Sequence, residues 1–82
     1  MDEVIETLME ACGALGIRPG APFLTVHEFE AHVLRTFPAV SAEAKSKQGE
    51  WALQAVRAAQ ERKTSAVVQC IENIRQLSVP RG

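Results

Sequence analysis

Apolar residues recur along the chain at intervals of three and four, the spacing that places side chains on one face of an α-helix. Four segments show this spacing, and polar or proline-containing stretches lie between them. No segment alternates apolar and polar residues in the manner of a half-buried strand. The pattern therefore predicts an all-α fold, a small compact helical bundle of four helices.

The first predicted helix starts at the acidic beginning of the chain and ends at Gly16. Its apolar face comprises Val4, Ile5, Leu8, Ala11, Cys12 and Leu15, and the opposite face comprises Glu3, Glu6 and Glu10. Gly16 can adopt the left-handed conformation that ends many helices, and Ile17 can fold back onto the apolar face. We therefore expect an amphipathic helix with a glycine at its C-terminal turn.

The second predicted helix, residues 26–37, follows a connection that contains two prolines and a glycine. Thr25 and Glu28 have the spacing of a capping box, in which each side chain bonds to the backbone N–H of the other residue. Pro38 prevents the helix from continuing. Its buried face is expected to comprise Val26, Phe29, Val33 and Phe37, with Leu34 beside it.

The third predicted helix, residues 42–62, has Ser41 as its N-cap and an apolar face that is mostly alanine. This face comprises Ala44, Trp51, Ala52, Ala55, Val56, Ala58 and Ala59. A fourth helix follows, with Thr64 or Ser65 as N-cap, and its apolar face comprises Val67, Cys70, Ile71, Ile74 and Leu77. Because neither glycine nor proline separates these two segments, one continuous bent helix is the alternative, and the bundle would then have three helices.

The bulk composition is typical of one small soluble domain. The chain has 82 residues and a net charge of −1, so it produces no long-range field that would attract nucleic acid or an anionic membrane. No apolar run reaches the ~20 residues of a membrane span, and the acidic start does not resemble a signal peptide. We expect a single helical domain over residues 1–78, a short tail over residues 79–82, and a cytoplasmic location.

The segment HEFEAH, residues 27–32, combines two histidines with two glutamates. His27 and His32 are five residues apart, about 140° around a helix, whereas the zinc-protease motif needs histidines four residues apart. Glu28 and His32 could supply two ligands of a metal site, but two more would be needed. We interpret the segment as the solvated face of the helix and predict neither a metal nor a cofactor.

Glu30 lies on the core side of the predicted second helix, where an unpaired carboxylate is costly. One interpretation is a boundary residue whose carboxylate reaches solvent. The alternative is a buried or interfacial ion pair, and Arg62, on the apolar side of the third helix, is the expected partner. Loss of folding or self-association in a Glu30→Ala variant would be the signature of such a pair.

The sequence carries no motif of a known catalytic site. It contains no glycine-rich phosphate loop, no nucleophile elbow and no cysteine-pair metal motif. Cys12 and Cys70 occupy apolar helix faces, where packing is the expected role and a redox pair the alternative. We therefore do not expect an enzyme.

The leading hypothesis is a non-catalytic protein–protein interaction module, a small adaptor, regulator or assembly subunit that binds through an apolar helix face. Leu53 lies well off the alanine face of the third helix, and Val56 lies between Leu53 and that face, so apolar side chains span more than half of the circumference. Such a helix either lies centrally within its own bundle in a monomer or shares one side with another chain. Phe23 and Leu24 must also find cover. The predicted partner is a second copy of the chain, as a homodimer, or another protein. The predicted partner-binding residues are Leu53, Val56, Trp51, Glu30 and Arg62.

An alternative from a different class is a small nucleic-acid-binding regulator that uses Arg57, Arg62 and Lys63. The junction between the third and fourth helices lacks the glycine that helix-turn-helix motifs often contain. Glu61 and Glu72 also dilute the positive charge around these residues. Nucleic acid is therefore the less favoured partner, because its binding depends on neutralising phosphates.

Overall fold

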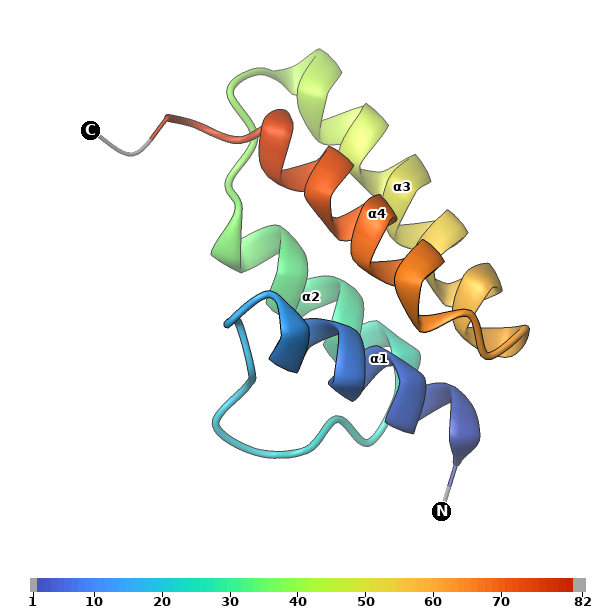
Figure 1. Ribbon diagram of the computed structural model, residues 1–82. Helices are drawn as coiled ribbons and strands as arrows, with labels where there is room; N and C mark the ends of the chain where they lie inside the picture. The colour runs from blue at the N-terminus through green and yellow to red at the C-terminus, as the bar shows by residue number, and fades with distance from the viewer. Residues whose placement is uncertain (1, 81–82) are drawn as a thin grey trace.

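The structure, a computed structural model, describes residues 2–80 and contains no strand in that range (Figure 1). It has four helices: α1 (Glu3–Ala14), α2 (Val26–Thr36), α3 (Ala42–Gln60) and α4 (Thr64–Gln76). The all-α prediction is confirmed. Because α3 and α4 are separate helices, the bundle has four helices rather than three. Residues 1, 81 and 82, which belong to the predicted domain and tail, lie outside the described residues.

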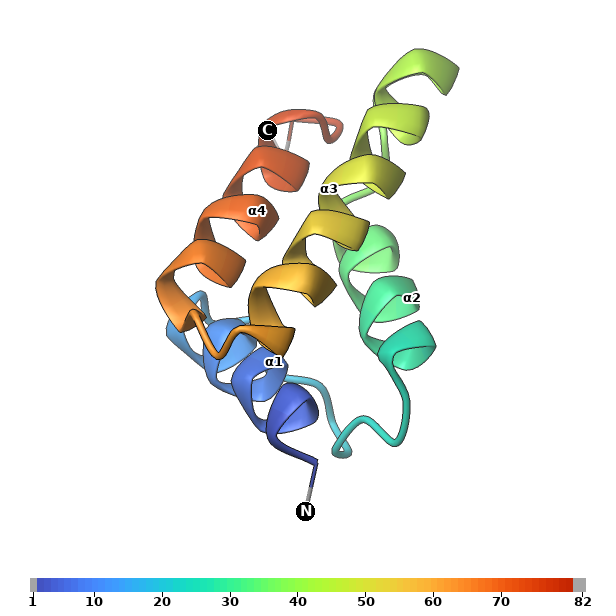
Figure 2. The same cartoon turned by 90° about the vertical axis from the view of Figure 1, so that its right-hand side faces the viewer.

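The four helices form two layers. The first layer is an antiparallel pair of α3 and α4, at the upper right of Figure 1 and nearest the viewer in Figure 2. The second layer comprises α1 and α2, which both pack against that pair. The radius of gyration is 11.7 Å, close to the value of about 12 Å expected for a compact domain of this length.

The core lies between the two layers and joins large side chains to a face of small ones. Its largest fully buried apolar side chains are Leu8, Phe29, Val33, Val67, Ile71 and Ile74. On α3 the buried side chains are mostly alanine: Ala52, Ala55 and Ala59 have no exposed surface. Small side chains of this kind leave room for other helices to pack close to the α3 backbone.

The end of α1 has the predicted glycine turn. Gly16 has a φ of 73°, in the left-handed region that glycine adopts without steric cost. The Ile17 N–H donates to the Cys12 carbonyl at 2.9 Å, and the Gly16 N–H donates to the Gly13 carbonyl at 3.2 Å. These two bonds define a Schellman motif, and Ile17 packs against the core.

The turn between α3 and α4 has the same geometry without a glycine. Arg62 has a φ of 59°, a conformation that costs a residue with a side chain roughly 1–2 kcal/mol. The Arg62 N–H donates to the Ala59 carbonyl at 2.9 Å, and the Lys63 N–H donates to the Ala58 carbonyl at 3.0 Å. Arg62 therefore occupies the position that Gly16 has after α1, and α3 ends two residues earlier than predicted.

Three of the four helix starts have a side-chain cap. The Thr25–Glu28 capping box and the Ser41 cap are present as predicted, and Asp2 caps α1. The predicted cap of α4 is wrong, because Lys63 is the N-cap residue and no side chain bonds to the first turn. The Thr64 hydroxyl donates instead to the Glu10 carboxylate at 3.2 Å.

Gln48 is a buried polar residue on the alanine face of α3, and its side chain is 1% exposed. Its Nε2 donates to the Phe37 carbonyl at 2.9 Å and to the Ile74 carbonyl at 3.0 Å. The amide thus links α3 to the C-terminal ends of α2 and α4. The sequence gives one signal for this role, since Gln48 lies four residues from both Ala44 and Ala52.

The segment after α4 pairs with the connection between α2 and α3. The Val40 N–H donates to the Leu77 carbonyl at 3.1 Å, and the Val79 N–H donates to the Pro38 carbonyl at 2.8 Å. Together they form a short antiparallel bridge. Val79, the first residue of the predicted tail, is therefore held by the backbone of the α2–α3 connection.

Candidate functional site

The outward face of α3 is the surface that the sequence predicted to bind a partner. It belongs to the helix layer nearest the viewer in Figure 2. Trp51 is 37% exposed and Leu53 is 49% exposed. They lie about 160° apart around the helix, with Glu50 and Gln54 between them. Both residues line one shallow depression together with Lys47, Glu50 and Gln54.

Val56 does not contribute to this face, which corrects the prediction. It is 8% exposed and belongs to the core. Val56 lies about 40° from Ala52 around the helix, and that side of α3 is covered by the rest of the bundle. The candidate interaction face of α3 is therefore narrower than predicted, with Trp51 and Leu53 as its large apolar side chains.

The proposed ion pair between Glu30 and Arg62 is not formed. The Glu30 carboxylate lies 3.6 Å from His27 Nδ1 and is half-buried. The Arg62 guanidinium pairs instead with the carboxylate of Glu3. Because His27 and both members of the Glu3–Arg62 pair are exposed to solvent, each contact contributes little to stability, typically 0–1 kcal/mol.

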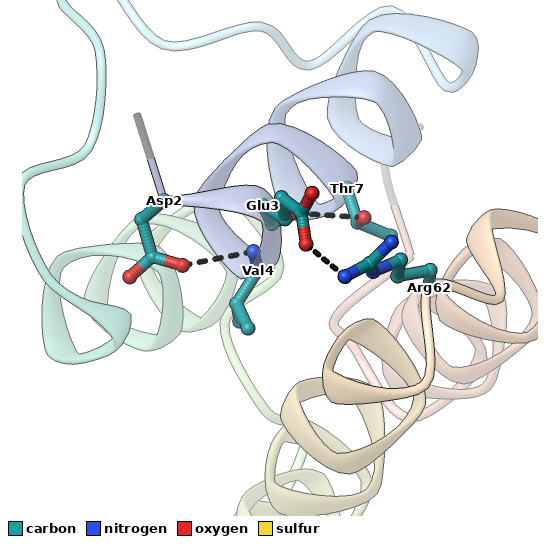
Figure 3. A network of polar contacts seen from close by, with 5 residues as sticks. All are labelled: Asp2, Glu3, Val4, Thr7 and Arg62. Carbon is teal, nitrogen blue, oxygen red and sulfur yellow. Dashed lines mark hydrogen bonds and ion pairs between the residues drawn. The ribbon is translucent and has the colours of Figure 1, made fainter.

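Arg62 belongs to a small polar network at the start of α1, shown in Figure 3. The Asp2 carboxylate accepts from the Val4 N–H at 2.9 Å. The Thr7 hydroxyl donates to the Glu3 carbonyl at 2.9 Å, which satisfies this buried threonine. Through the Glu3–Arg62 pair, the network joins the first turn of α1 to the α3–α4 turn. Glu3 and Arg62 thus have a structural role in joining these two segments.

The basic residues of the alternative hypothesis are largely neutralised by neighbouring acids. Arg62 pairs with Glu3, and Lys63 Nζ lies 3.2 Å from the Glu61 carboxylate. Within residues 2–80, Arg57 forms no ion pair. Three cations against two acids leave a local charge of only +1, which is a weak basis for phosphate neutralisation.

The candidate metal ligands are engaged in holding the connection between α1 and α2. His32 Nε2–H donates to the Ile17 carbonyl at 2.6 Å, a group that can only accept. The Glu28 carboxylate accepts from the Thr25 N–H at 2.9 Å and from the Leu24 N–H. In the described range 2–80, no three His, Cys, Asp or Glu side chains are placed to hold a metal ion.

The two cysteine thiols are buried and free. Burial raises the pKa of Cys12 to about 11 and also raises the pKa of Cys70. A raised pKa keeps a thiol protonated at neutral pH, and the thiolate is the reactive form. Both side chains belong to the apolar core, consistent with the packing role that their helical positions predicted.

Sequence reasoning missed a second apolar surface, the groove between α1 and the end of the α1–α2 connection. We call it the α1 groove. It is lined by Ile5, Glu6, Met9, Glu10, Pro22, Phe23 and Leu24. The available signal was the pair Phe23 and Leu24, which the sequence left without obvious cover. Phe23 is buried, whereas Leu24 is 82% exposed.

The chain matches no protein-family model, no curated protein and no solved structure. Within the described residues, no helix has both the length and the apolar character needed to cross a membrane. The outward face of α3 and the α1 groove are the surfaces whose side chains are available to a partner.

Proposed function

We propose that this chain is a non-catalytic protein–protein interaction module that binds through the outward face of α3, with a second copy of itself as partner. The observation that carries the proposal is the exposure of Trp51 and Leu53 on a helix whose opposite face is filled by its own domain. Neither Trp51 nor Leu53 belongs to the hydrophobic core of the domain. A protein–protein interface on this face would bury the apolar surface that Trp51 and Leu53 now expose to solvent.

The chemistry of this face suits an interface in which a few large side chains dominate. Tryptophan is among the residues most often found at energetic hot spots, where truncation costs about 2 kcal/mol or more. Burying the exposed half of Leu53 would contribute roughly 1 kcal/mol. The polar residues Lys47, Glu50 and Gln54 lie around Trp51 and Leu53 and would form the hydrated rim.

Sedimentation velocity or light scattering over a range of concentrations tests the proposal. We expect a dimer that Leu53→Glu disrupts, because the variant places a carboxylate in the contact. Gln60→Glu, an exposed position near the end of α3, adds the same charge outside the contact and should leave the dimer intact. A chain that stays monomeric at its highest soluble concentration would overturn the homodimer.

A nucleic-acid titration at two salt concentrations separates this proposal from the alternative. Phosphate contacts produce a steep fall in affinity with salt. We expect no salt-dependent binding, because Arg62 and Lys63 already have acidic partners. Binding with a steep salt slope that Arg57→Gln reduces would favour the nucleic-acid-binding regulator instead.

A further inference from the structure

We infer that the α1 groove is a second docking surface, and that its partner is a cationic amphipathic segment of another protein. The groove is lined by residues of α1 and of the α1–α2 connection, which is the long loop in the lower part of Figure 1, and it shares no lining residue with the depression on α3. It is therefore distinct from the proposed dimer face. Two features of the groove support this inference: an apolar lining that includes the exposed Leu24, and the carboxylates of Glu6 and Glu10, which have no cationic partner among the described residues.

The exposed leucine is held in place by its backbone. The N–H groups of Leu24 and Thr25 both donate to the carboxylate of Glu28. On the other side of Leu24, the Phe23 ring packs edge-on against Phe29, with the ring centroids 5.8 Å apart. The backbone on both sides is thus fixed while the Leu24 side chain faces solvent, so binding would cost little additional ordering.

The position of Leu24 departs from the usual arrangement at a helix start. The residue before an N-cap often packs against the fourth helical residue as a hydrophobic staple. Here that partner, Phe29, is covered by Phe23 instead, and Leu24 is left exposed. Beside it, Met9 on α1 is only partly buried. The groove therefore offers apolar contacts that the fold itself does not use.

The rim of the groove carries negative charge that the fold leaves unneutralised. The α1 sequence contains Glu3, Glu6 and Glu10 and no basic residue. Glu3 pairs with Arg62, but within residues 2–80 Glu6 forms no ion pair. The Glu10 carboxylate accepts from the Thr64 hydroxyl, and no cation among the described residues pairs with it. The charge excludes anionic ligands such as nucleic acid and acidic membranes, and it favours lysine or arginine beside an apolar side chain.

The matching partner is a short amphipathic helix with lysines flanking one leucine face. Helix-in-groove recognition uses apolar anchors at i, i+3 or i+4. Ile5 and Met9 are themselves one turn apart on α1, about 6 Å along the axis. A single turn of the partner could therefore place one apolar side chain beside Leu24 and a cation opposite Glu6.

Titration of the isotope-labelled full chain with a synthetic Leu/Lys amphipathic peptide, followed by nitrogen–proton correlation spectra, tests the inference. We expect saturable shifts confined to α1 and residues 22–24. Leu24→Ala should weaken binding about tenfold, because the variant removes most of the apolar side chain that the bound peptide would bury. Glu6→Gln should weaken it about two- to fivefold, the range of an exposed ion pair. Glu43→Gln, an exposed position in the first turn of α3, removes the same charge away from both proposed surfaces and is the matched control.

The outcomes distinguish this inference from the proposed homodimer. A peptide in which glutamate replaces every lysine should not bind. Equal binding of both peptides, or shifts on α3 in place of α1, would overturn the cationic-partner inference. Concentration-dependent shifts at Leu24 without peptide would identify a second copy as the occupant and would also overturn it. Leu53→Glu should leave peptide binding unchanged whether or not the chain dimerises.

Discussion

Replacing Gln48 with methionine tests how much the buried amide contributes to stability. Methionine has a similar length and flexibility but no N–H, so the Phe37 and Ile74 carbonyls both lose a donor. Among residues 2–80, no other backbone N–H donates to the Phe37 carbonyl, whereas the Ile74 carbonyl also accepts from the Leu77 N–H at 3.1 Å. We therefore expect the larger penalty at Phe37.

The expected loss is about 2–4 kcal/mol. It combines one buried carbonyl left without a donor, at 1–3 kcal/mol, with the loss of a second hydrogen bond, at roughly 1 kcal/mol. The total stability expected for a chain of this length is about 4–12 kcal/mol. The variant should therefore lose a large share of it and melt about 10–25 °C lower.

Urea and thermal unfolding followed by far-ultraviolet circular dichroism measure this loss. Gln60→Met, at an exposed position on the same helix and outside the proposed contact, makes the same chemical change without removing a buried hydrogen bond. It should change stability by no more than about 0.5 kcal/mol. If Gln48→Met also costs less than about 1 kcal/mol, the argument that the two carbonyls depend on this amide is wrong.

Three further predictions concern the helix ends and the core. Arg62→Gly should be about 1 kcal/mol more stable than Arg62→Ala in urea, since both lose the Glu3 ion pair and only glycine relieves the left-handed backbone; equal stabilities would contradict this. Thr25→Ala should cost about 1 kcal/mol in the same assay, because the α2 capping box is lost. For Cys12, the folded pKa of about 11 exceeds the ordinary value of 9.0, so the unfolded state binds fewer protons between these pH values. Stability should fall by roughly 2 kcal/mol as pH rises from about 9 to 11, and less in Cys12→Ala.

The helices were predictable from sequence because their spacing and caps are local features. The end of α1 is identified by the conformational freedom of Gly16 and by the hydrophobicity of Ile17. Both properties follow from the residue types alone. Arg62 adopts the same left-handed conformation for a different reason. The close packing of α3 against α4 requires a tight turn at that point, and this requirement appears only in three dimensions. The end of α3 was therefore placed two residues too late.

The candidate site was harder to predict because it depends on neighbours that sequence periodicity does not specify. Val56 lies at the border of the α3 apolar face, and the direction from which the other helices approach decides that it is buried. Phe23 and Leu24 are adjacent in a connection without periodicity. The local sequence does not determine which of the two side chains is buried in the core. The α1 groove could therefore be identified only from the three-dimensional structure.

The alanine face of α3 has a consequence for the alignment of the helices. Methyl groups of equal size offer almost the same contacts when one helix slides past another, so they fix how close α4 comes but not how far along it lies. Gln48 is the buried polar residue on this face, and its amide reaches the Ile74 carbonyl in one axial alignment only. The hydrogen bond of this buried amide thus selects one axial alignment of α3 and α4. Without it, the alanine contacts alone would allow more than one alignment of the two helices.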